Sequence, residues 1–259
     1  MNARSSIDVA EVARFDALAA EWWDPAGPFA PLHQLNPARL AFIREACLAH
    51  FAADASTRAP FAGLRLLDIG CGGGLVAEPM ARLGFTVTAI DAAPEALAAA
   101  RAHAEGLGLA VDYREETVEG LVGAGEVAFD VVLALEVVEH VSAPAAFLAD
   151  AARLLASGGL MILSTLNRTA KSLALGKIAA EYILRWAPMG THDWRKFVTP
   201  AELAAMLEAA GLTASSPVGL RYDPVGGTWK RAADCGVNYL MAASPTPPPS
   251  SPGVSPGDP

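Results

Sequence analysis

Short apolar runs alternate with segments of helical periodicity through the middle of this chain. Leu64, Leu66, Leu67 and Ile69 form the first such run, and their pattern is that of a buried strand. The predicted strands are 64–69, 86–90, 111–113, 129–135 and 160–165. Strands that alternate with helices in this way form a parallel sheet covered by helices on both faces. The pattern therefore predicts an α/β fold.

The part of the chain that precedes this alternation predicts two helices. Asp8 opens the first helix, and Pro25 ends it. The apolar stripe of this helix consists of Val12, Phe15, Ala19, Trp22 and Trp23. Pro37 begins the second helix at the position after an asparagine N-cap. We expect 8–60 to form a helical cap and 1–7 to be disordered.

The part that follows the alternation predicts one more helix and the end of the sheet. The helix runs over 200–210 and is stopped by Gly211. Two further strand candidates lie near 213–221 and 236–242. The stretch 244–259 is rich in Pro, Ser and Gly, and we expect it to be disordered. Because no internal linker interrupts the pattern, 8–243 is expected to form a single domain.

Composition narrows the functional classes. The chain has 259 residues, of which 53% are hydrophobic, so it can bury a substantial core. Its formal net charge of −9 argues against nucleic-acid binding, which needs a basic surface. The three cysteines show no metal-finger spacing, which fits a reducing compartment. We find neither a secretory signal nor an apolar run long enough to span a membrane, and expect a cytoplasmic protein.

A glycine-rich turn follows the first predicted strand directly. Glycines at a strand-to-helix turn let the backbone approach a ligand closely, and they leave backbone amides accessible. A dinucleotide fingerprint counted from Gly70 would require glycine where Leu75 stands, which disfavours a nicotinamide dehydrogenase. The spacing Gly70-x-Gly72-x-Gly74 is instead typical of S-adenosylmethionine (SAM) binding.

Asp91 ends the second predicted strand, 21 residues after Gly70. In a strand–helix–strand unit this position places a carboxylate at the tip of the neighbouring strand, where it can accept hydrogen bonds from both hydroxyls of a ribose. The alternative is a structural role as the N-cap of the next helix. The order of strand, turn, helix, strand and acid favours the ribose role.

Two carboxylates and an imidazole follow the fourth predicted strand. If Glu136 begins a helical turn, Glu139 and His140 lie on the same face of it. Such a set can hold a divalent cation, with oxygen ligands suited to Mg²⁺ and the histidine permitting Zn²⁺ or Mn²⁺. A second interpretation makes His140 a general base for a phenol. A third gives His140 only a capping or packing role, with both acids solvated.

A long insertion separates the fifth predicted strand from the helix over 200–210. One helical face of it carries Leu175, Ile178, Ala179, Tyr182, Ile183 and Trp186. Between Arg168 and Arg185 there are four basic residues and one acidic residue. A basic amphipathic helix of this kind lies at a lipid surface or packs over a site as a lid. Both interpretations are compatible with a lipid substrate.

Three polar residues outside these motifs are also candidates. Arg39 lies on the helix that Pro37 begins, and its guanidinium can bind a cofactor carboxylate if this helix folds over the ligand edge of the sheet. Otherwise Arg39 belongs to a solvated face. His192 and Asp193 form a polar pair that either contacts substrate or braces its loop.

The motifs together resemble one family in order along about 8–243. They are Trp22-Trp23-Asp24-Pro25, Pro31-Leu32-His33, Leu35-Asn36-Pro37-x-Arg39-Leu40, the glycine turn, Glu136-Val137-Val138-Glu139-His140, Ser164-Thr165-Leu166-Asn167-Arg168-Thr169, Ala180-Glu181-Tyr182-Ile183-Leu184-Arg185-Trp186, Gly190-Thr191-His192-Asp193-Trp194 and Asn238-Tyr239-Leu240-Met241. With them the chain resembles the ubiquinone-biosynthesis O-methyltransferases, which are class I SAM-dependent enzymes.

The resemblance implies a substrate class and a set of site residues. The substrates would be a polyprenyl-hydroxyphenol (2-polyprenyl-6-hydroxyphenol, a catechol) and 3-demethylubiquinol. The implied SAM contacts are Arg39, Gly70, Asp91 and Leu135, and Gly72 belongs to the same turn. The implied ligands of a divalent metal, Mg²⁺ or another cation, are Glu136, Glu139 and His140. The metal interpretation is therefore favoured over the other two.

The resemblance also implies an architecture and partners. The fold would be Rossmann-like, with a seven-stranded sheet whose last strand is antiparallel and a helical insertion at 168–196 after the fifth strand. The segment 168–190 corresponds to one linked in the family to membrane association. It would contact anionic lipid at the inner face of the cytoplasmic membrane, within reach of a ubiquinone-biosynthesis complex.

Two alternative functions remain open at this stage. One is a SAM-dependent methyltransferase that acts on another small molecule, for example at carbon. The other is a SAM-binding scaffold without catalytic activity. The intact set Glu136, Glu139 and His140 argues against the scaffold, which would not need it.

Overall fold

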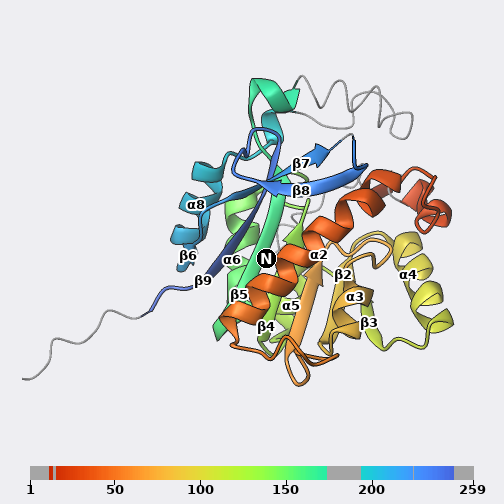
Figure 1. Ribbon diagram of the computed structural model, residues 1–259. Helices are drawn as coiled ribbons and strands as arrows, with labels where there is room; N and C mark the ends of the chain where they lie inside the picture. Colours follow the sequence, from red (N-terminus) through yellow and green to blue (C-terminus); the bar gives the residue numbers. More distant parts are fainter. Residues whose placement is uncertain (1–11, 14–15, 174–193, 224, 248–259) are drawn as a thin grey trace, which may run out of the picture.

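The computed structural model describes residues 12–13, 16–173, 194–223 and 225–247. These residues form one nine-stranded sheet with helices on both faces (Figure 1). The strand order is β3-β2-β1-β4-β5-β9-β7-β8, and β6 pairs with β9 beside this path. The α/β prediction is confirmed, but the predicted count of seven strands is too low for the described residues.

The parallel half of the sheet contains the predicted strands. They are β1 (Arg65–Ile69), β2 (Thr86–Asp91), β3 (Val111–Glu115), β4 (Phe129–Leu135) and β5 (Leu155–Leu166). The largest difference is the start of β5, five residues before the predicted 160. Gly158 and Gly159 suggest a turn, yet they continue the strand across a register shift in its pairing with β4. A bulge absorbs the extra residues, so no turn is needed.

The antiparallel half is more divided than predicted. Its strands are β6 (Leu212–Ala214), β7 (Val218–Asp223), β8 (Thr228–Ala232) and β9 (Asn238–Pro245). The single strand predicted near 213–221 is two strands, which pair with different parts of β9. Pairing of β9 with β5 is antiparallel, as predicted for the last strand. Its final residues, Ser244 and Pro245, extend into the predicted disordered tail.

The sequence analysis did not predict β8, because its residues lack the apolar pattern of a buried strand. Lys230 and Arg231 stand in its middle, and most of the strand is exposed. Charged residues are typical of edge strands, where they discourage pairing with another chain. β8 forms at the edge by pairing with β7, and Arg231 donates two hydrogen bonds to Glu45 at 2.7 and 2.8 Å.

Helices cover the two faces of the sheet in two groups. The helices are α2 (Ala30–His50), α3 (Ala77–Arg82), α4 (Pro94–Gly106), α5 (Val118–Ala124), α6 (Pro144–Arg153) and α8 (Pro200–Ala209), with short 3-10 turns η1 (Ala19–Glu21) and η2 (Trp194–Lys196). One hydrophobic cluster joins α2, α3 and α4 to one face, with Leu66 and Ile162 among its strand residues. A second cluster joins α5, α6 and α8 to the other face, with Leu67 and Leu163. Successive strand residues face opposite sides, so both faces are buried.

Helix α2 begins at Ala30, six residues before the predicted N-cap at Asn36, which corrects that prediction. Pro31 occupies the first turn of α2, where the backbone N–H groups have no hydrogen-bond partner within the helix, so the N–H that proline lacks is not needed. Pro37 lies inside the helix and removes one helical hydrogen bond. Burial of flanking apolar residues such as Ile43 against the sheet offsets this loss.

The remaining sequence predictions on helices have mixed outcomes. Helix α8 is confirmed: Thr199 and Glu202 form a capping box at its start, and Gly211 follows its end with φ of 82°. Most of the predicted insertion at 168–196, including His192 and Asp193, lies outside the described residues, as does Asp8. Among the helices that the structure describes, none is long and apolar enough to cross a membrane.

Candidate active site

A cavity of about 170 Å³ opens at the carboxyl ends of the parallel strands. The ends of β1 and β2 and the residues directly after β3 and β4 contribute to its wall, as expected for a ligand site in an open α/β sheet. The predicted site residues that line it are Gly70, Gly72, Asp91, Glu136 and His140. Arg39, Leu135 and Glu139 are not among its lining residues.

The glycine turn is shaped by its neighbours within the protein. Gly70 and Gly72 have φ of 69° and 50°, a region that L-residues with a side chain rarely adopt. A Cβ on Gly70 would lie 2.6 Å from Val137, and one on Gly72 would lie 2.2 Å from Trp22. The glycines are therefore required by close packing of Val137 and Trp22 as well as by any ligand.

Asp91 holds the glycine turn and lines the cavity at the same time. Its Oδ2 accepts a hydrogen bond from the Gly72 amide at 2.7 Å, and its Oδ1 accepts one from the Ala93 amide at 2.9 Å. Burial raises the pKa of Asp91, and these backbone hydrogen bonds oppose the shift. The N-cap of α4 is Ala93, so Asp91 is not the N-cap that was the alternative prediction. A carboxylate has about four acceptor positions, so both bonds leave capacity for ribose hydroxyls.

Arg39 is a buried residue of α2 that lies near two acidic residues. It is buried at 4% exposure, and its Nε has no hydrogen-bond partner among the described residues. Burial lowers the pKa of Arg39, while the negative charges of Glu136 and Asp68 raise it. Asp68 is buried as well, and its Oδ2 also lacks a partner in the described part of the chain. A buried guanidinium with an unsatisfied donor suits the carboxylate of a ligand.

Glu136 has a strained backbone at the edge of the cavity. Its φ of 56° is left-handed, and such non-glycine conformations cost of order 1–3 kcal/mol and cluster at functional sites. Its amide donates to the carbonyl oxygen of Ser164 at 2.9 Å, and the Ser164 hydroxyl donates to its Oε1 at 2.8 Å. Ser164 thus holds both the backbone and the side chain of Glu136.

Glu139 is not among the residues that line the cavity and is buried at 3% exposure. The hydroxyl of Thr165 donates to its Oε2 at 2.8 Å. Burial raises the pKa of Glu139 well above its ordinary value, and the nearby charge of Glu136 raises it further. Burial thus disfavours the charged form of this carboxyl group.

The three predicted metal ligands do not form one cluster. Among the described residues, no group of three or more His, Cys, Asp or Glu side chains could hold a metal ion. Glu136 and His140 reach the cavity, whereas Glu139 is buried outside its wall. In this arrangement the three side chains do not fit a divalent cation. Metal binding therefore stays a prediction from the family resemblance.

Leu135 is the last residue of β4 and pairs with Ser164. Its side chain packs in the hydrophobic cluster beneath α2. The structure thus places Leu135 beside Glu136 without bringing its side chain to the cavity, and its contact with SAM stays a prediction.

Several residues of the cavity wall were missed by the sequence analysis. They are Val12, Trp22, Ile69, Ile90, Ala92, Ala93, Ala96, Glu116, Thr117, Val118, Val137, Val141 and Phe147. Trp22 had been assigned to the apolar stripe of a helix, and nothing in that stripe indicates the glycine turn as its partner. For Thr117 a signal existed, because a threonine a few residues after the predicted strand 111–113 is a preferred N-cap, and Thr117 is the N-cap of α5.

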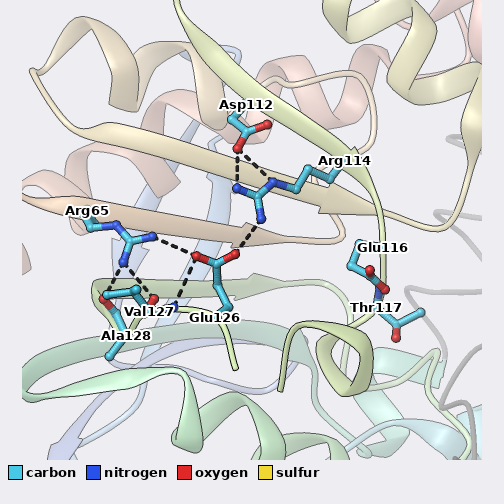
Figure 2. A network of polar contacts seen from close by, with 8 residues as sticks. All are labelled: Arg65, Asp112, Arg114, Glu116, Thr117, Glu126, Val127 and Ala128. Carbon is cyan, nitrogen blue, oxygen red and sulfur yellow. Dashed lines mark hydrogen bonds and ion pairs between the residues drawn. The ribbon is translucent and has the colours of Figure 1, made fainter. Parts of the chain in front are cut away.

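A polar network supports the element that carries Thr117. Thr117 caps the start of α5 by accepting a hydrogen bond from Gly120 at 3.0 Å. Beyond the other end of α5, Glu126 accepts hydrogen bonds from Arg114 at 2.7 Å and from Arg65 at 3.2 Å (Figure 2). These bonds lower the pKa of Glu126, with that from Arg114 the largest cause. The start of α5 is thereby capped, and the chain after its end is tied to β1 and β3, which supports this wall of the cavity.

Comparison with known proteins gives concordant matches. A family model described as "Methyltransferase domain" matches residues 40–216. The chain is 59% identical over 239 residues to a ubiquinone biosynthesis O-methyltransferase of Caulobacter sp. (strain K31), covering 92% of this chain and 95% of the relative. It is 54% identical over 245 residues to the protein of that name from Azorhizobium caulinodans, covering 95% and 96%.

Among solved structures, the fold is similar to that of magnesium protoporphyrin IX methyltransferase from Synechocystis PCC 6803 with bound SAH. The TM-score is 0.62 at 18% identity, covering 90% of this chain and 94% of the other. This similarity supports the fold and the class I methyltransferase architecture.

Proposed function

The chain belongs to the ubiquinone biosynthesis O-methyltransferase family and is a SAM-dependent O-methyltransferase, and from this premise we propose its acceptors and its mechanism. The acceptors we propose are polyprenylated catechols and quinols, namely 2-polyprenyl-6-hydroxyphenol and 3-demethylubiquinol. They follow from the ubiquinone pathway that the relatives' name states.

One observation carries the proposal for the mechanism. The glycine turn and Asp91, which suit a nucleoside, line the same cavity as Glu136 and His140, which suit a phenol. Direct transfer of a methyl group requires the donor and the acceptor to lie side by side, as they would in one cavity. Alignment of the reacting atoms then supplies much of the acceleration.

SAM supplies a methyl group on a sulfonium, which carries its own leaving group. The residues of this chain bind and orient it. We propose that Asp91 accepts hydrogen bonds from the ribose hydroxyls while it holds Gly72. We propose that Arg39, whose Nε is unsatisfied in the described residues, binds the carboxylate at the other end of the donor.

The acceptor hydroxyl must lose a proton during transfer. A phenol with a pKa of about 10 is mostly protonated at neutral pH and is a poor nucleophile. We propose that His140 takes this proton as general base and that Glu136 orients the ring through its second hydroxyl, because both side chains line the cavity. Activation by a divalent cation is the competing hypothesis from the family resemblance.

Contact with lipid is a further part of the proposal. A polyprenylated acceptor partitions into the membrane, so the enzyme has to meet it at a lipid surface. The basic amphipathic pattern of 168–190 supports peripheral contact with anionic lipid at the inner face of the cytoplasmic membrane, near a ubiquinone-biosynthesis complex.

The decisive experiment measures methyl transfer from radiolabelled SAM to a short-prenyl catechol, with Mg²⁺ and then with EDTA. We expect transfer that is unaffected by EDTA and a His140→Asn variant whose kcat falls roughly 100-fold or more while SAM affinity is retained. If EDTA abolishes methyl transfer, His140 is not the general base, and activation by a divalent cation is supported. Measurable SAM binding without transfer would contradict the acceptor class and favour another acceptor or a scaffold.

A further inference from the structure

Two adjacent hydroxyl side chains near the end of β5 each hold one of the two acidic residues that follow β4. Ser164 donates to Glu136 and Thr165 donates to Glu139, both at 2.8 Å. Ser164 is 1% exposed and Thr165 is fully buried. Neither lines the cavity, so neither touches the ligands proposed above.

The two hydroxyls lie on opposite faces of the sheet. Side chains alternate along β5: Ile162 packs in the cluster beneath α2, and Leu163 packs in the cluster on the other face. Ser164 therefore faces the side of α2, and Thr165 faces the side of α5, α6 and α8. The two acids are not separated in this way: Glu136 acts on the pKa of Arg39 in α2, and it also acts on the pKa of Glu139, so the two carboxyl groups lie close together.

The segment after β4 is thus held by two successive hydroxyl groups of β5. Ser164 fixes Glu136 by a backbone bond of 2.9 Å as well as by its hydroxyl. These two bonds hold a residue whose left-handed φ of 56° is unfavourable by itself. Thr165 binds Glu139 next to His140, which faces the cavity.

We propose that Ser164 and Thr165 are positioning residues for methyl transfer, which together hold the segment from Glu136 to His140 so that its first and last side chains face the acceptor. Thr165 acts through Glu139, which serves as an internal anchor. This inference rests on the function proposed above, because it assigns Glu136 and His140 to the acceptor. It adds two residues that act without contacting the substrate.

Paired variants separate the hydroxyl from the volume of the side chain. Thr165→Val keeps the shape and removes the hydroxyl, whereas Thr165→Ser keeps the hydroxyl and removes a methyl group. We expect Thr165→Val and Ser164→Ala to lower kcat roughly 10- to 100-fold, as misplacement of a catalytic group does. Thr165→Ser and Ser164→Thr should recover most of this loss. SAM affinity, measured by calorimetry, should stay within about twofold in all four variants, since Arg39 and Asp91 are intact.

Thr88→Val is the matched control, because Thr88 is a buried threonine of the same sheet, on β2, which β1 and β4 separate from β5, and it does not line the cavity. It should leave kcat unchanged. If Thr165→Val is as active as the wild type while Thr165→Ser is impaired, the residue acts by packing and the proposal is wrong. If Thr165→Val fails to fold, Ser164→Ala alone decides: a kcat equal to that of the wild type overturns the proposal. A wild type without transfer to any catechol would instead contradict the proposed function.

Discussion

The carboxylate of Asp91 accepts a hydrogen bond from the backbone amide of Gly72 at 2.7 Å, which joins the end of β2 to the glycine turn after β1. The residue predicted to bind a ribose therefore also builds the turn beside which the ribose would lie. Asp91 therefore contributes both to the stability of the folded protein and to the predicted affinity for SAM, and variants of Asp91 can separate these two effects.

Replacement of Asp91 should affect both properties to different degrees. Asp91→Ala leaves the amides of Gly72 and Ala93 without their acceptor, which should lower the free energy of unfolding by about 1–3 kcal/mol. Asp91→Asn keeps one acceptor oxygen and should lose less stability, yet bind SAM at least roughly tenfold more weakly because the charged acceptor is lost. Urea denaturation and calorimetry check these effects. Wild-type SAM affinity in Asp91→Asn would refute the ribose contact.

Trp22 and the glycine turn should show strong energetic coupling. A Cβ on Gly73 would lie 1.9 Å from Cδ1 of Trp22, so Gly73→Ala should destabilise the protein by about 1–3 kcal/mol through overpacking. In a Trp22→Leu background the same change should cost much less, because the smaller side chain leaves room. A double-mutant cycle in urea measures the coupling. Additive effects of the two changes would show that Trp22 does not pack on the turn in solution.

Gly123 provides the control for that cycle. It lies inside α5, and a Cβ placed on it would meet nothing within 4 Å. Gly123→Ala should therefore be neutral or stabilise the protein by up to about 1 kcal/mol, since alanine favours a helix more than glycine does.

Fluorescence of Trp22 should report binding of the methyl donor. Trp22 lines the cavity, whereas its neighbour Trp23 stacks on His103 with ring centroids 3.5 Å apart and does not line that cavity. Addition of SAM should change the emission of the wild type and of Trp23→Phe. The change should be absent or much reduced in Trp22→Phe. A response that depends on Trp23 instead would place the donor elsewhere.

Asp68 should make the protein less stable as the pH rises. Burial raises the pKa of this carboxyl group from 3.8 to about 7, although the charge of Arg39 opposes the shift. The folded state holds the proton more tightly than the unfolded state, so the contribution to stability is complete below pH 3.8 and is lost as the pH rises through 7. Unfolding in urea at a series of pH values should show this decline.

Asp68→Asn removes the titrating group and should make the loss of stability between pH 4 and 7 smaller than in the wild type. The difference in the free energy of unfolding should be on the order of a few kcal/mol over this range. Some decline should remain, because burial also raises the pKa of Asp91 and of Glu139. An unchanged slope in Asp68→Asn would show that Asp68 is already ionised in the folded protein at low pH.

Much of the parallel half of the fold was predictable from local patterns. Most of its strands are buried and appear in the sequence as mainly apolar runs, although β3 at the edge is partly exposed, and the glycine turn and Asp91 stand at the ends of β1 and β2. The predictions that were wrong concern elements whose existence depends on distant partners. Strand β8 forms because β7 offers an edge, and α2 continues through Pro37 because the sheet buries its face.

The sequence by itself determined the alternating α/β architecture, the place of the cavity at the strand ends and the presence of Gly70, Asp91, Glu136 and His140 in its wall. These follow from spacing within single strand–turn units, which act locally. Only the tertiary structure decided that Trp22 packs on the glycine turn, and that Ser164 and Thr165 hold Glu136 and Glu139. Such contacts join residues far apart in the chain, and their geometry depends on how the elements pack, which no local pattern contains.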